Sequence, residues 1–452
     1  MNANFFKNIS ILLFTSLSLI FSPAFAQTWN KPKPSEVIKI QENLRDKAWN
    51  NLNDRQSIHD YVRFSTEIGD YEAAIGILRR ILRDFSVDDP EYIRIKYEIG
   101  LMCYRMQAYA LAVSFWNDIL QRPDLPVDTR AHIQDYLPSA LKETQQNRLS
   151  FSSWSGYRWQ SNANAGPRHD LISLFGAPFT IDPGYRKKPD SNFFIQSALD
   201  YSIDLENQRQ DRLEFQFSGY LTQQRDFSEL NVGLADVNVG PRLALASEFW
   251  PDATIKPYAT ASLTALDQHI ISNSYGIGTS LSLPFNNGVV LSPAAEWRRG
   301  DIRDKIATRN PEEDSWSFSL TGQTPINSWM SWIGKASFQS SNLNLGVSGT
   351  RQYGLQTALK IELDPFVGSL TRRWAVSPFL KLEVARYDQI DMTVHPDKLR
   401  RDFNWKMGSV IDLPLRHGFG ITALAQFERN QSNIANYRND NWTMMIGPRI
   451  QY

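Results

Sequence analysis

Residues 441–452 read NWTMMIGPRIQY, and this stretch decides the fold of the larger part of the chain. Steps of two back from the last residue give side chains that are all apolar or aromatic: Tyr452, Ile450, Pro448, Ile446, Met444 and Trp442. The intervening side chains are mostly polar or small: Gln451, Arg449, Gly447, Met445 and Thr443. A period of two puts the two sets on opposite faces of a β-strand. The sequence therefore predicts a final strand with one apolar face and a terminal aromatic residue.

The same alternation recurs along the chain from Ser150 onward. It is clearest in segments 193–205, 213–217, 353–363, 374–384 and 403–407. The polar faces of these strands and of the last one carry charges of both signs: Asp200, Asp204, Arg212, Glu214, Lys360, Glu362, Lys381, Glu383, Lys406 and Arg449. Opposite charges on one face can pair between neighbouring strands, so we expect a mixed-charge interior rather than a pore of one sign.

The pattern predicts about fourteen strands. They begin near residues 151, 192, 211, 230, 255, 273, 288, 314, 328, 351, 373, 402, 418 and 440. The connections at 286–288, 324–327 and 414–417 are short, whereas those at 161–191, 300–313, 340–350, 388–401 and 430–439 are long. A soluble β-sandwich also alternates, but long strands with alternately short and long connections are typical of a transmembrane barrel. We therefore expect an antiparallel outer-membrane β-barrel over residues 149–452, with its C-terminus in the periplasm.

The aromatic content agrees with a barrel in a membrane. The chain has 13 Trp, 17 Tyr and 25 Phe, which make up 12% of its residues, at a mean hydropathy of −0.39. Transmembrane barrels carry aromatic girdles at both membrane interfaces, while their lumen and loops stay polar. The formal net charge is zero, which gives no indication of a nucleic-acid partner.

The first 26 residues have the pattern of a secretory signal peptide. Lys7 precedes an apolar run over 9–21, and a small-x-small cleavage site follows at 24–26. We expect cleavage after Ala26, which leaves Gln27 as the first residue of the mature chain. A membrane-anchoring helix is the alternative, but the run is short and Pro23 interrupts its end. The single cysteine, Cys103, excludes an internal disulfide.

Residues 27–148 form the second part, and their pattern is helical. The stretches 69–82 and 107–120 match at an offset of 38, which pairs Tyr71 with Tyr109 and Leu78 with Trp116. This spacing is close to one tetratricopeptide repeat, and a third helical stretch near 128–146 would cap the array. A plain helical bundle is the alternative. Repeat arrays of this kind bind peptide segments on a concave face, so Tyr71, Tyr109 and Trp116 are candidate contacts for a bound protein segment, called the client below.

No catalytic pattern emerges from the sequence. HExxH, GxSxG and CxxC motifs are absent, and the six histidines are scattered without metal-ligand spacing. We therefore expect a protein that is not an enzyme and that holds neither a metal nor a cofactor.

Pro448 has a possible functional consequence, because proline cannot donate a hydrogen bond to a strand ladder. Its missing donor would point either to the thirteenth strand or to the first, and the sequence leaves both possibilities open. If it points to the first strand, the seam that closes the barrel is weakened there, and lateral opening becomes a hypothesis.

The stretch SGYRWQSNANAGP at 155–167 takes an aromatic strand into an Asn-rich turn. Together with the signal peptide, the short repeat domain and the barrel, it resembles the surface lipoprotein assembly modulators, or Slam proteins. The residues that match this family's turn are Ser161, Asn162, Asn164 and Pro167. An ordinary Asn-rich turn is the alternative for this stretch.

The resemblance implies a monomeric outer-membrane protein without cofactors that helps client proteins or lipoproteins across that membrane. Its periplasmic helices would receive the client. The last strand resembles the signal that the barrel-assembly machinery recognises, through Trp442, Ile446, Ile450 and Tyr452. The alternatives are an exopolysaccharide export porin, a passive porin with a periplasmic docking domain and, last, an enzyme.

Overall fold

The computed structural model describes residues 35–51, 54–106, 108–206, 211–245, 252–285, 288–302, 312–327, 329–343, 349–364, 373–415 and 418–452. The expected signal peptide and its cleavage site lie outside these ranges. The chain forms two compact units, which meet in the sequence between Arg148 and Leu149. We describe each unit by itself.

The helical unit contains six helices within the described residues. They are α2 (Ser35–Asn50), α3 (Arg55–Glu67), α4 (Tyr71–Leu82), α5 (Pro90–Arg105), α6 (Tyr109–Leu120) and α7 (Val127–Thr144). Helices that follow one another in the sequence pack against each other. The two matched stretches become α4 and α6, which begin at Tyr71 and Tyr109 and end at equivalent residues. None of these helices is both long and apolar enough to cross a membrane.

Local sequence explains where several helices begin. Asp54 and Asp70 accept hydrogen bonds from the first backbone N–H groups of α3 and α4. Asp89 does the same for α5, and Pro90 occupies the first turn of that helix. A side-chain acceptor at this position satisfies donors that the helix itself leaves without a partner. The Asp89-Pro90 pair therefore marks the boundary between the two helical hairpins.

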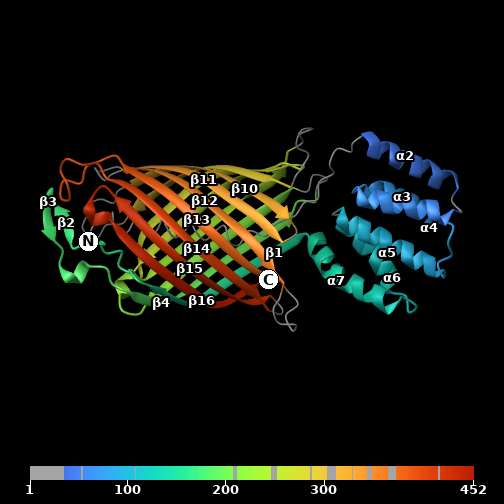
Figure 1. Cartoon of the computed structure of the whole chain (residues 1–452), viewed down its shortest axis with the longest axis horizontal. Helices are drawn as coiled ribbons and strands as arrows, with labels where there is room; N and C mark the ends of the chain where they lie inside the picture. Colours follow the sequence, from blue (N-terminus) through green and yellow to red (C-terminus); the bar gives the residue numbers. More distant parts are fainter. Residues whose placement is uncertain are drawn as a thin grey trace. The chain divides into compact units, whose positions relative to one another are not determined.

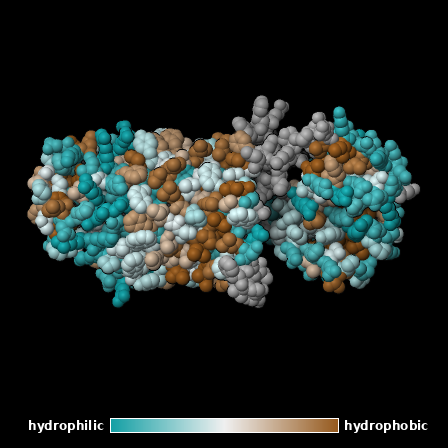
Figure 2. Space-filling model, in the orientation of Figure 1, coloured by the Kyte–Doolittle hydropathy of each residue, from teal (hydrophilic) through white to brown (hydrophobic). Residues whose placement is uncertain are grey.

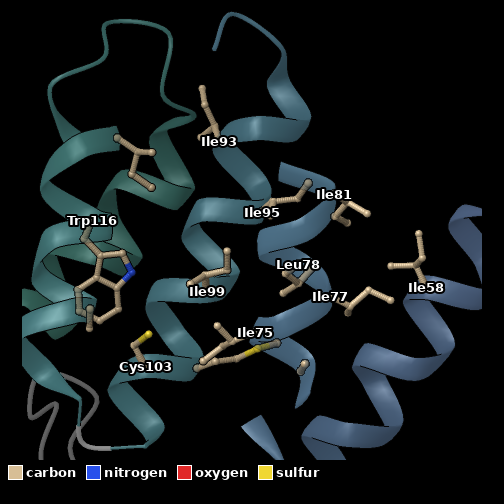
Figure 3. Close-up of a cluster of buried hydrophobic side chains, with 14 of the residues drawn as sticks. Ile58, Ile75, Ile77, Leu78, Ile81, Ile93, Ile95, Ile99, Cys103 and Trp116 are labelled. Carbon is tan, nitrogen blue, oxygen red and sulfur yellow. The ribbon is translucent and has the colours of Figure 1, made fainter. Parts of the chain in front are cut away.

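The core of the helical unit lies between α3, α4, α5 and α6 (Figure 3). Isoleucines dominate it, and Trp116 of α6 and Cys103 of α5 complete it. Gly100 lies under the Trp116 indole: an ideal Cβ on Gly100 would be 2.3 Å from Trp116 Nε1. Ile99, Gly100 and Cys103 of α5 are therefore core positions.

The second unit is a closed antiparallel barrel of fourteen strands (Figure 1). Its strands are β1 (Asn147–Gln160), β4 (Asp190–Asp204), β5 (Arg212–Gln224), β6 (Val232–Ala244), β7 (Thr254–Leu266), β8 (His269–Pro284), β9 (Val290–Ile302), β10 (Glu312–Asn327), β11 (Met330–Leu343), β12 (Thr350–Leu363), β13 (Trp374–Tyr387), β14 (Arg401–Pro414), β15 (Phe419–Ser432) and β16 (Asn439–Gln451). Each strand pairs with the next, and β16 returns to β1. The expected fold and strand number are confirmed.

We call the barrel end at which β1 starts and β16 ends the terminal rim, and the opposite end the loop rim. Several connections depart from the predicted alternation of lengths, among them 245–253 at the terminal rim, which has nine residues. At the loop rim, β7 and β8 are joined by Asp267 and Gln268 alone, both with positive φ, so β8 begins at His269 rather than near 273. Such turns usually contain Asn-Gly, and this pair gave no turn signal. At the terminal rim, the connection 364–373 is long.

The first loop-rim connection, predicted as a long loop over 161–191, contains a small hairpin. Its strands are β2 (Leu171–Leu174) and β3 (Ala177–Thr180). The turn residues Phe175 and Gly176 have positive φ and donate backbone hydrogen bonds to Thr393 and Val394 of the connection between β13 and β14. The hairpin is thus held by another loop of the same rim, a contact that local pattern could not predict.

The outer wall of the barrel is apolar and aromatic. Exposed aromatic side chains near the loop rim include Tyr157, Trp159, Phe193, Tyr275, Trp316, Phe318, Tyr353, Phe403 and Trp442. Near the terminal rim they include Phe215, Trp329, Trp332, Phe419 and Tyr452. A brown hydrophobic band covers part of the wall, and hydrophilic residues dominate toward the loop rim (Figure 2). Two aromatic girdles around an apolar band are typical of outer-membrane barrels, so this unit is a barrel of that type.

Candidate functional site

The seam between β1 and β16 is the point at which the barrel closes. The register keeps one offset, without a shift, from Ser152 opposite Gln451 to Gln160 opposite Thr443. Within it, the ladder is interrupted where Ser155 and Gly156 lie opposite Pro448 and Gly447. The pairing of β16 with its other neighbour, β15, passes through Pro448 without a gap.

The direction of the missing donor is settled by the ends of the strands. Phe151 and Tyr452 exchange two backbone hydrogen bonds, of 3.0 and 2.8 Å, whereas the N–H of Gln451 donates to Gly418 at 2.8 Å. Successive residues of a strand turn their backbone groups to alternate neighbours, so every second residue from Tyr452 faces β1. Pro448 belongs to this set. The seam therefore lacks one N–H donor, opposite Ser155.

This interruption is not confined to the seam. Pro378 of β13 lies in a similar gap in the ladder with β12, and Pro293 of β9 lies in one with β8. Pro241 and Pro257 lie in the gap between β6 and β7. Proline alone therefore does not distinguish the seam from other ladders of this barrel.

The two strands approach each other closely at the gap. An ideal Cβ on Gly447 would lie 1.8 Å from the carbonyl oxygen of Ser155, and one on Gly156 would lie 2.1 Å from that of Ile446. Only glycine fits at such distances, so Gly156 and Gly447 are required by the contact. The seam is thus one hydrogen bond short, but it is closed and packed.

Apolar side chains back the seam on the lumenal side. Trp154 of β1 and Phe194 of β4 meet edge to face at 4.8 Å, and both are fully buried. They belong to a lumenal cluster of Trp154, Phe194, Tyr220, Val232, Leu234, Leu266, Val410, Leu424 and Met445. Alternation along single strands predicts polar inner faces and does not predict this cluster. Its signal was Trp154, an aromatic residue out of phase with Tyr157 and Trp159.

Arg158 connects β1 to the strands on the side away from the seam, β4 and β5. Its Nε donates to Asn192 Oδ1 of β4 at 3.1 Å, and its Nη1 donates to the Tyr220 hydroxyl of β5 at 2.7 Å. Asn192 donates in turn to Gln224. These buried groups fix β1 on β4 and β5, so motion at the β1–β16 seam would leave β1 attached to the first half of the barrel.

The lumenal charges are paired within the wall, as the sequence predicts. Glu214 bonds Arg242 at 2.5 Å and Lys256 at 3.1 Å. Four further pairs follow: Arg298–Asp236, Lys381–Glu383, Lys406–Glu428 and Arg449–Asp412. Each of these five acids is paired with at least one of the six bases, so these described residues line the lumen with charges of both signs.

The Asn-rich turn closes the loop-rim end of the seam. The N–H of Ser161 donates to the Trp442 carbonyl at 2.9 Å, and the Trp442 N–H donates to Ser161 Oγ at 2.8 Å. Asn162 is buried; its amide donates to the Gly166 and Asp440 carbonyls, and its Oδ1 accepts from the Gly166 N–H. The backbone N–H of Asn162 donates to Asn441 Oδ1 at 2.9 Å, and we call Ser161, Asn162 and Asn441 the latch.

The remaining residues of the Asn-rich turn hold the loop rather than the seam. Asn164 donates to the Arg186 carbonyl at 2.7 Å and accepts from the Lys188 N–H at 2.9 Å. Pro167 is half-buried, and the next residue, Arg168, donates its backbone N–H to the Arg438 carbonyl. Ser161 and Asn162 therefore fasten the first loop to the last strand, whereas Asn164 joins two parts of the loop itself.

The candidate client contacts of the helical unit have different exposures. Trp116 is fully buried against Gly100, so its role is core packing, and direct contact with a client is excluded for the folded state. Tyr109 is half-buried, and its ring meets that of Tyr104 at 5.4 Å. Tyr71 is half-buried at the start of α4. The sequence missed Tyr136 of α7, which joins this aromatic group and is exposed.

The proposed assembly signal lies entirely on the outer face of β16. Trp442, Ile446, Ile450 and Tyr452 are all exposed there. The rings of Phe427 and Trp442 lie 5.0 Å apart at an interplanar angle of 50°, and Tyr452 is 74% exposed. The C-terminal aromatic residue is therefore accessible at the terminal rim.

Comparisons with known proteins complete the description. No family model matches the chain, and no curated protein matches it. Among solved structures, an anion-selective porin from Comamonas acidovorans is similar at 10% identity and a TM-score of 0.33, with 68% of this chain and 99% of that chain covered. An outer membrane channel from Pseudomonas putida F1 gives 12% identity, a TM-score of 0.33 and coverages of 67% and 95%. CdiB from Escherichia coli is similar at 12% identity and a TM-score of 0.36, with 67% of this chain and 63% of that chain covered. At these identities the similarity concerns the fold alone.

Proposed function

We propose that this protein assists the movement of client proteins, lipoproteins among them, across the outer membrane to the cell surface. In this proposal the helical unit lies in the periplasm and the loop rim faces outward. Outer-membrane barrels place their longer loops outside, and most of the longer connections of this barrel belong to the loop rim.

The observation that carries the proposal is the continuity of the chain. The last helix, α7, ends at Thr144, and β1, the strand at the seam, begins at Asn147. A client segment held by the helices would therefore be tethered by a very short linker to the strand at which the barrel closes. Tethering of this kind raises the local concentration of a bound segment without any new contact.

The helical unit supplies a plausible receptor surface. Tyr104, Tyr109 and Tyr136 form an aromatic group in which rings meet edge to face at 5.3 and 5.4 Å. Aromatic side chains with polar tips bind extended segments well, because they combine a large apolar area with a hydrogen-bonding group. In the proposal, an apolar or lipidated client segment contacts Tyr109, Tyr136 and Tyr71.

The seam is the proposed exit. Opening there would break the ladder between β1 and β16, which already lacks the Pro448 donor, and would part Ser161 from Trp442. The lumenal cluster and Arg158 would keep β1 on β4, so that β16 would move. The paired lumenal charges favour this reading over polysaccharide export, which requires a lumen of one sign matched to the polymer.

The first experiment is genetic. The gene is deleted and complemented either with the full chain or with a chain that lacks residues 33–146, and protease-shaved cells are analysed by surface proteomics. We expect one or a few surface proteins to disappear and to accumulate in the periplasm, with rescue by the full chain only. An unchanged surface proteome would sink the proposal.

A second experiment separates the seam from the lumen. Ser153 and Ile450 lie opposite each other across the seam, and Ala423 and Ile446 lie opposite each other between β15 and β16. Directly opposite residues have Cα atoms about 4.5–5.5 Å apart, a distance that a disulfide can bridge. Oxidised Ser153→Cys/Ile450→Cys should abolish client display, and reductant should restore it. The control, Ala423→Cys/Ile446→Cys, should display clients in both states.

A further inference from the structure

Three arginines stand in one row across the outer wall of the barrel. Arg351 of β12 lies directly opposite Arg386 of β13, and Arg386 lies directly opposite Arg401 of β14. All three side chains are exposed. Directly opposite residues on one face of a sheet are close neighbours, so like charges in this arrangement repel one another.

The row lies at the edge of the apolar band on all three strands. On β12 the outward side chains that follow Arg351 toward the terminal rim begin with Tyr353 and end with Leu363. The equivalent outward stretch runs from Val384 to Trp374 on β13 and from Phe403 to Leu413 on β14. Each stretch has the length that a tilted strand needs to cross a bilayer core, about 9–11 residues. Each arginine is the next outward side chain beyond that stretch.

The immediate surroundings contain no compensating acid. Ser340 and Asn433 flank the row on the two sides, and Tyr353, Val384 and Phe403 form the row beneath it. Asp388, the first residue after β13, is two residues from Arg386, and it makes no ion pair with any of the three arginines. Within the described parts of the chain, none of these guanidinium groups has an ion-pair partner.

The same chain pairs other arginines at this rim. Arg299 bonds Glu312 at 2.5 Å, Arg225 lies 3.9 Å from Asp226, and Arg168 lies 3.8 Å from Asp440. The row of Arg351, Arg386 and Arg401 is therefore a distinct feature. An anion that contacts all three guanidinium groups would offset the repulsion between them.

We infer that Arg351, Arg386 and Arg401 form a binding site for the phosphate groups of an outer-leaflet glycolipid. Guanidinium groups bind phosphate through paired hydrogen bonds and hold it more specifically than lysine does. The aromatic side chains of Tyr353 and Phe403 lie beneath the row, where the acyl chains of a bound lipid begin. The row thus matches a molecule with anionic groups at the interface and hydrocarbon below it.

The inference rests on the outward orientation of the loop rim that is part of the proposed function. Protease cleavage of the 388–400 connection in intact cells tests that orientation separately. Lipid binding requires no client, so an unchanged surface proteome would remove the proposed function and leave the lipid site intact.

The test uses the full chain, purified from outer membranes in a mild nonionic detergent. The site variant is Arg351→Gln/Arg386→Gln/Arg401→Gln. The matched control is Arg168→Gln/Arg225→Gln/Arg299→Gln, which removes the same charge from the same rim. Native mass spectrometry measures bound bisphosphorylated lipid A, with dephosphorylated lipid A and inorganic phosphate as comparison ligands.

We expect the wild type and the control to bind bisphosphorylated lipid A at least about tenfold more tightly than the site variant does. Dephosphorylated lipid A should bind all three proteins equally weakly. Equal affinity of the wild type and the site variant for bisphosphorylated lipid A would overturn the inference. Displacement of lipid A by millimolar inorganic phosphate would also overturn it, because the source would then be free phosphate.

A second readout guards against misfolding. In lipid-free detergent, the site variant should unfold at a higher temperature than the wild type, because the repulsion along the row is relieved. Added lipid A should raise the unfolding temperature of the wild type and leave that of the variant unchanged. If the triple variant fails to insert, Arg386→Gln alone, which removes the central charge, is used. It must show a smaller rise of the unfolding temperature without lipid and a smaller stabilisation by lipid A than the wild type. Absence of both effects would contradict the proposed lipid site.

Discussion

Gly100 and Trp116 fit together so closely that no side chain can replace the glycine without a rearrangement. The indole ring of Trp116 is fully buried and lies on the backbone of α5. The contact joins α5 to α6, the two helices of the second hairpin. It therefore fixes the geometry of the part of the helical unit that carries the aromatic group of Tyr104, Tyr109 and Tyr136.

Gly100→Ala should destabilise the helical unit by about 1–3 kcal/mol, because the added methyl overpacks a core that has no free space there. Gly76→Ala is the matched control, since an ideal Cβ on Gly76 meets nothing within 4 Å. That change should be neutral or stabilising by about 0.5–1 kcal/mol, as expected for glycine to alanine within a helix. Circular dichroism at the helical band, followed during heating of the full chain, measures both. Equal effects would show that Gly100 has no special packing role.

Pro448→Ala should restore the missing donor opposite Ser155 and strengthen the seam by about 0.5–1.5 kcal/mol, the net value of one hydrogen bond. Pro378→Ala offers the same chemistry in the ladder between β12 and β13, away from the seam. Both variants should resist heat unfolding in detergent slightly better than the wild type. If the seam opens during client display, only Pro448→Ala should slow it in a pulse-chase assay. Equal display rates for the two variants would argue against lateral opening.

Asn162→Ala should loosen the first loop, because it removes the Asn162 partners of the buried Gly166 backbone and of the partly buried Asp440 carbonyl. Each such group costs about 1–3 kcal/mol. We expect faster cleavage within 161–189 by an external protease. Heat-modifiable migration on gels should show that the barrel of this variant is still folded. Asn342→Ala, an exposed position at the same rim, should leave the cleavage rate unchanged. A cleavage rate like that of the wild type in Asn162→Ala would mean that the latch does not hold the loop.

Glu98 of α5 should make the helical unit less stable as the pH rises. Burial raises the pKa of Glu98 above its ordinary value, and Arg94 and His59 offset this only in part. A carboxyl group with a raised pKa in the folded state favours folding at low pH, and this contribution is lost as the pH rises through the folded-state pKa. Glu98→Gln should therefore raise the unfolding temperature near pH 7–8 and change it little near pH 4.

The control for this effect is Glu72→Gln, which alters an exposed glutamate of α4. It should not change the pH dependence of the helical unfolding temperature. A gain in stability for Glu98→Gln that is the same at pH 4 and pH 8 would contradict the role of carboxyl ionisation.

Much of the barrel was predictable because its signals are local. Alternation along β12 and β16 separates outward from inward side chains, and the period of two needs no knowledge of partners. The helical offset between Tyr71 and Tyr109 is equally local. The error at β8 arose because Asp267-Gln268 forms a tight turn without the residues that usually mark one.

The candidate site was predictable only in part. The sequence identified Pro448 and the turn residues Ser161 and Asn162. It could not show which neighbouring strand the Pro448 nitrogen faces, or which groups Asn162 bonds. Those depend on pairing between segments nearly three hundred residues apart, such as Asn162 with Asn441. The lumenal cluster of Trp154 and Phe194 was missed because it requires neighbouring inner faces to be known.

The sequence by itself determined which faces of the strands are apolar, how many strands there are and where the helical part ends, because side-chain periodicity is a property of adjacent residues. Only the tertiary structure decided the strand register. Register brings Arg351, Arg386 and Arg401 into one row, places Gly156 against Gly447, and turns the Pro448 nitrogen toward β1. These juxtapositions arise from barrel closure, in which each strand is fixed by hydrogen bonds to partners that the local sequence does not specify.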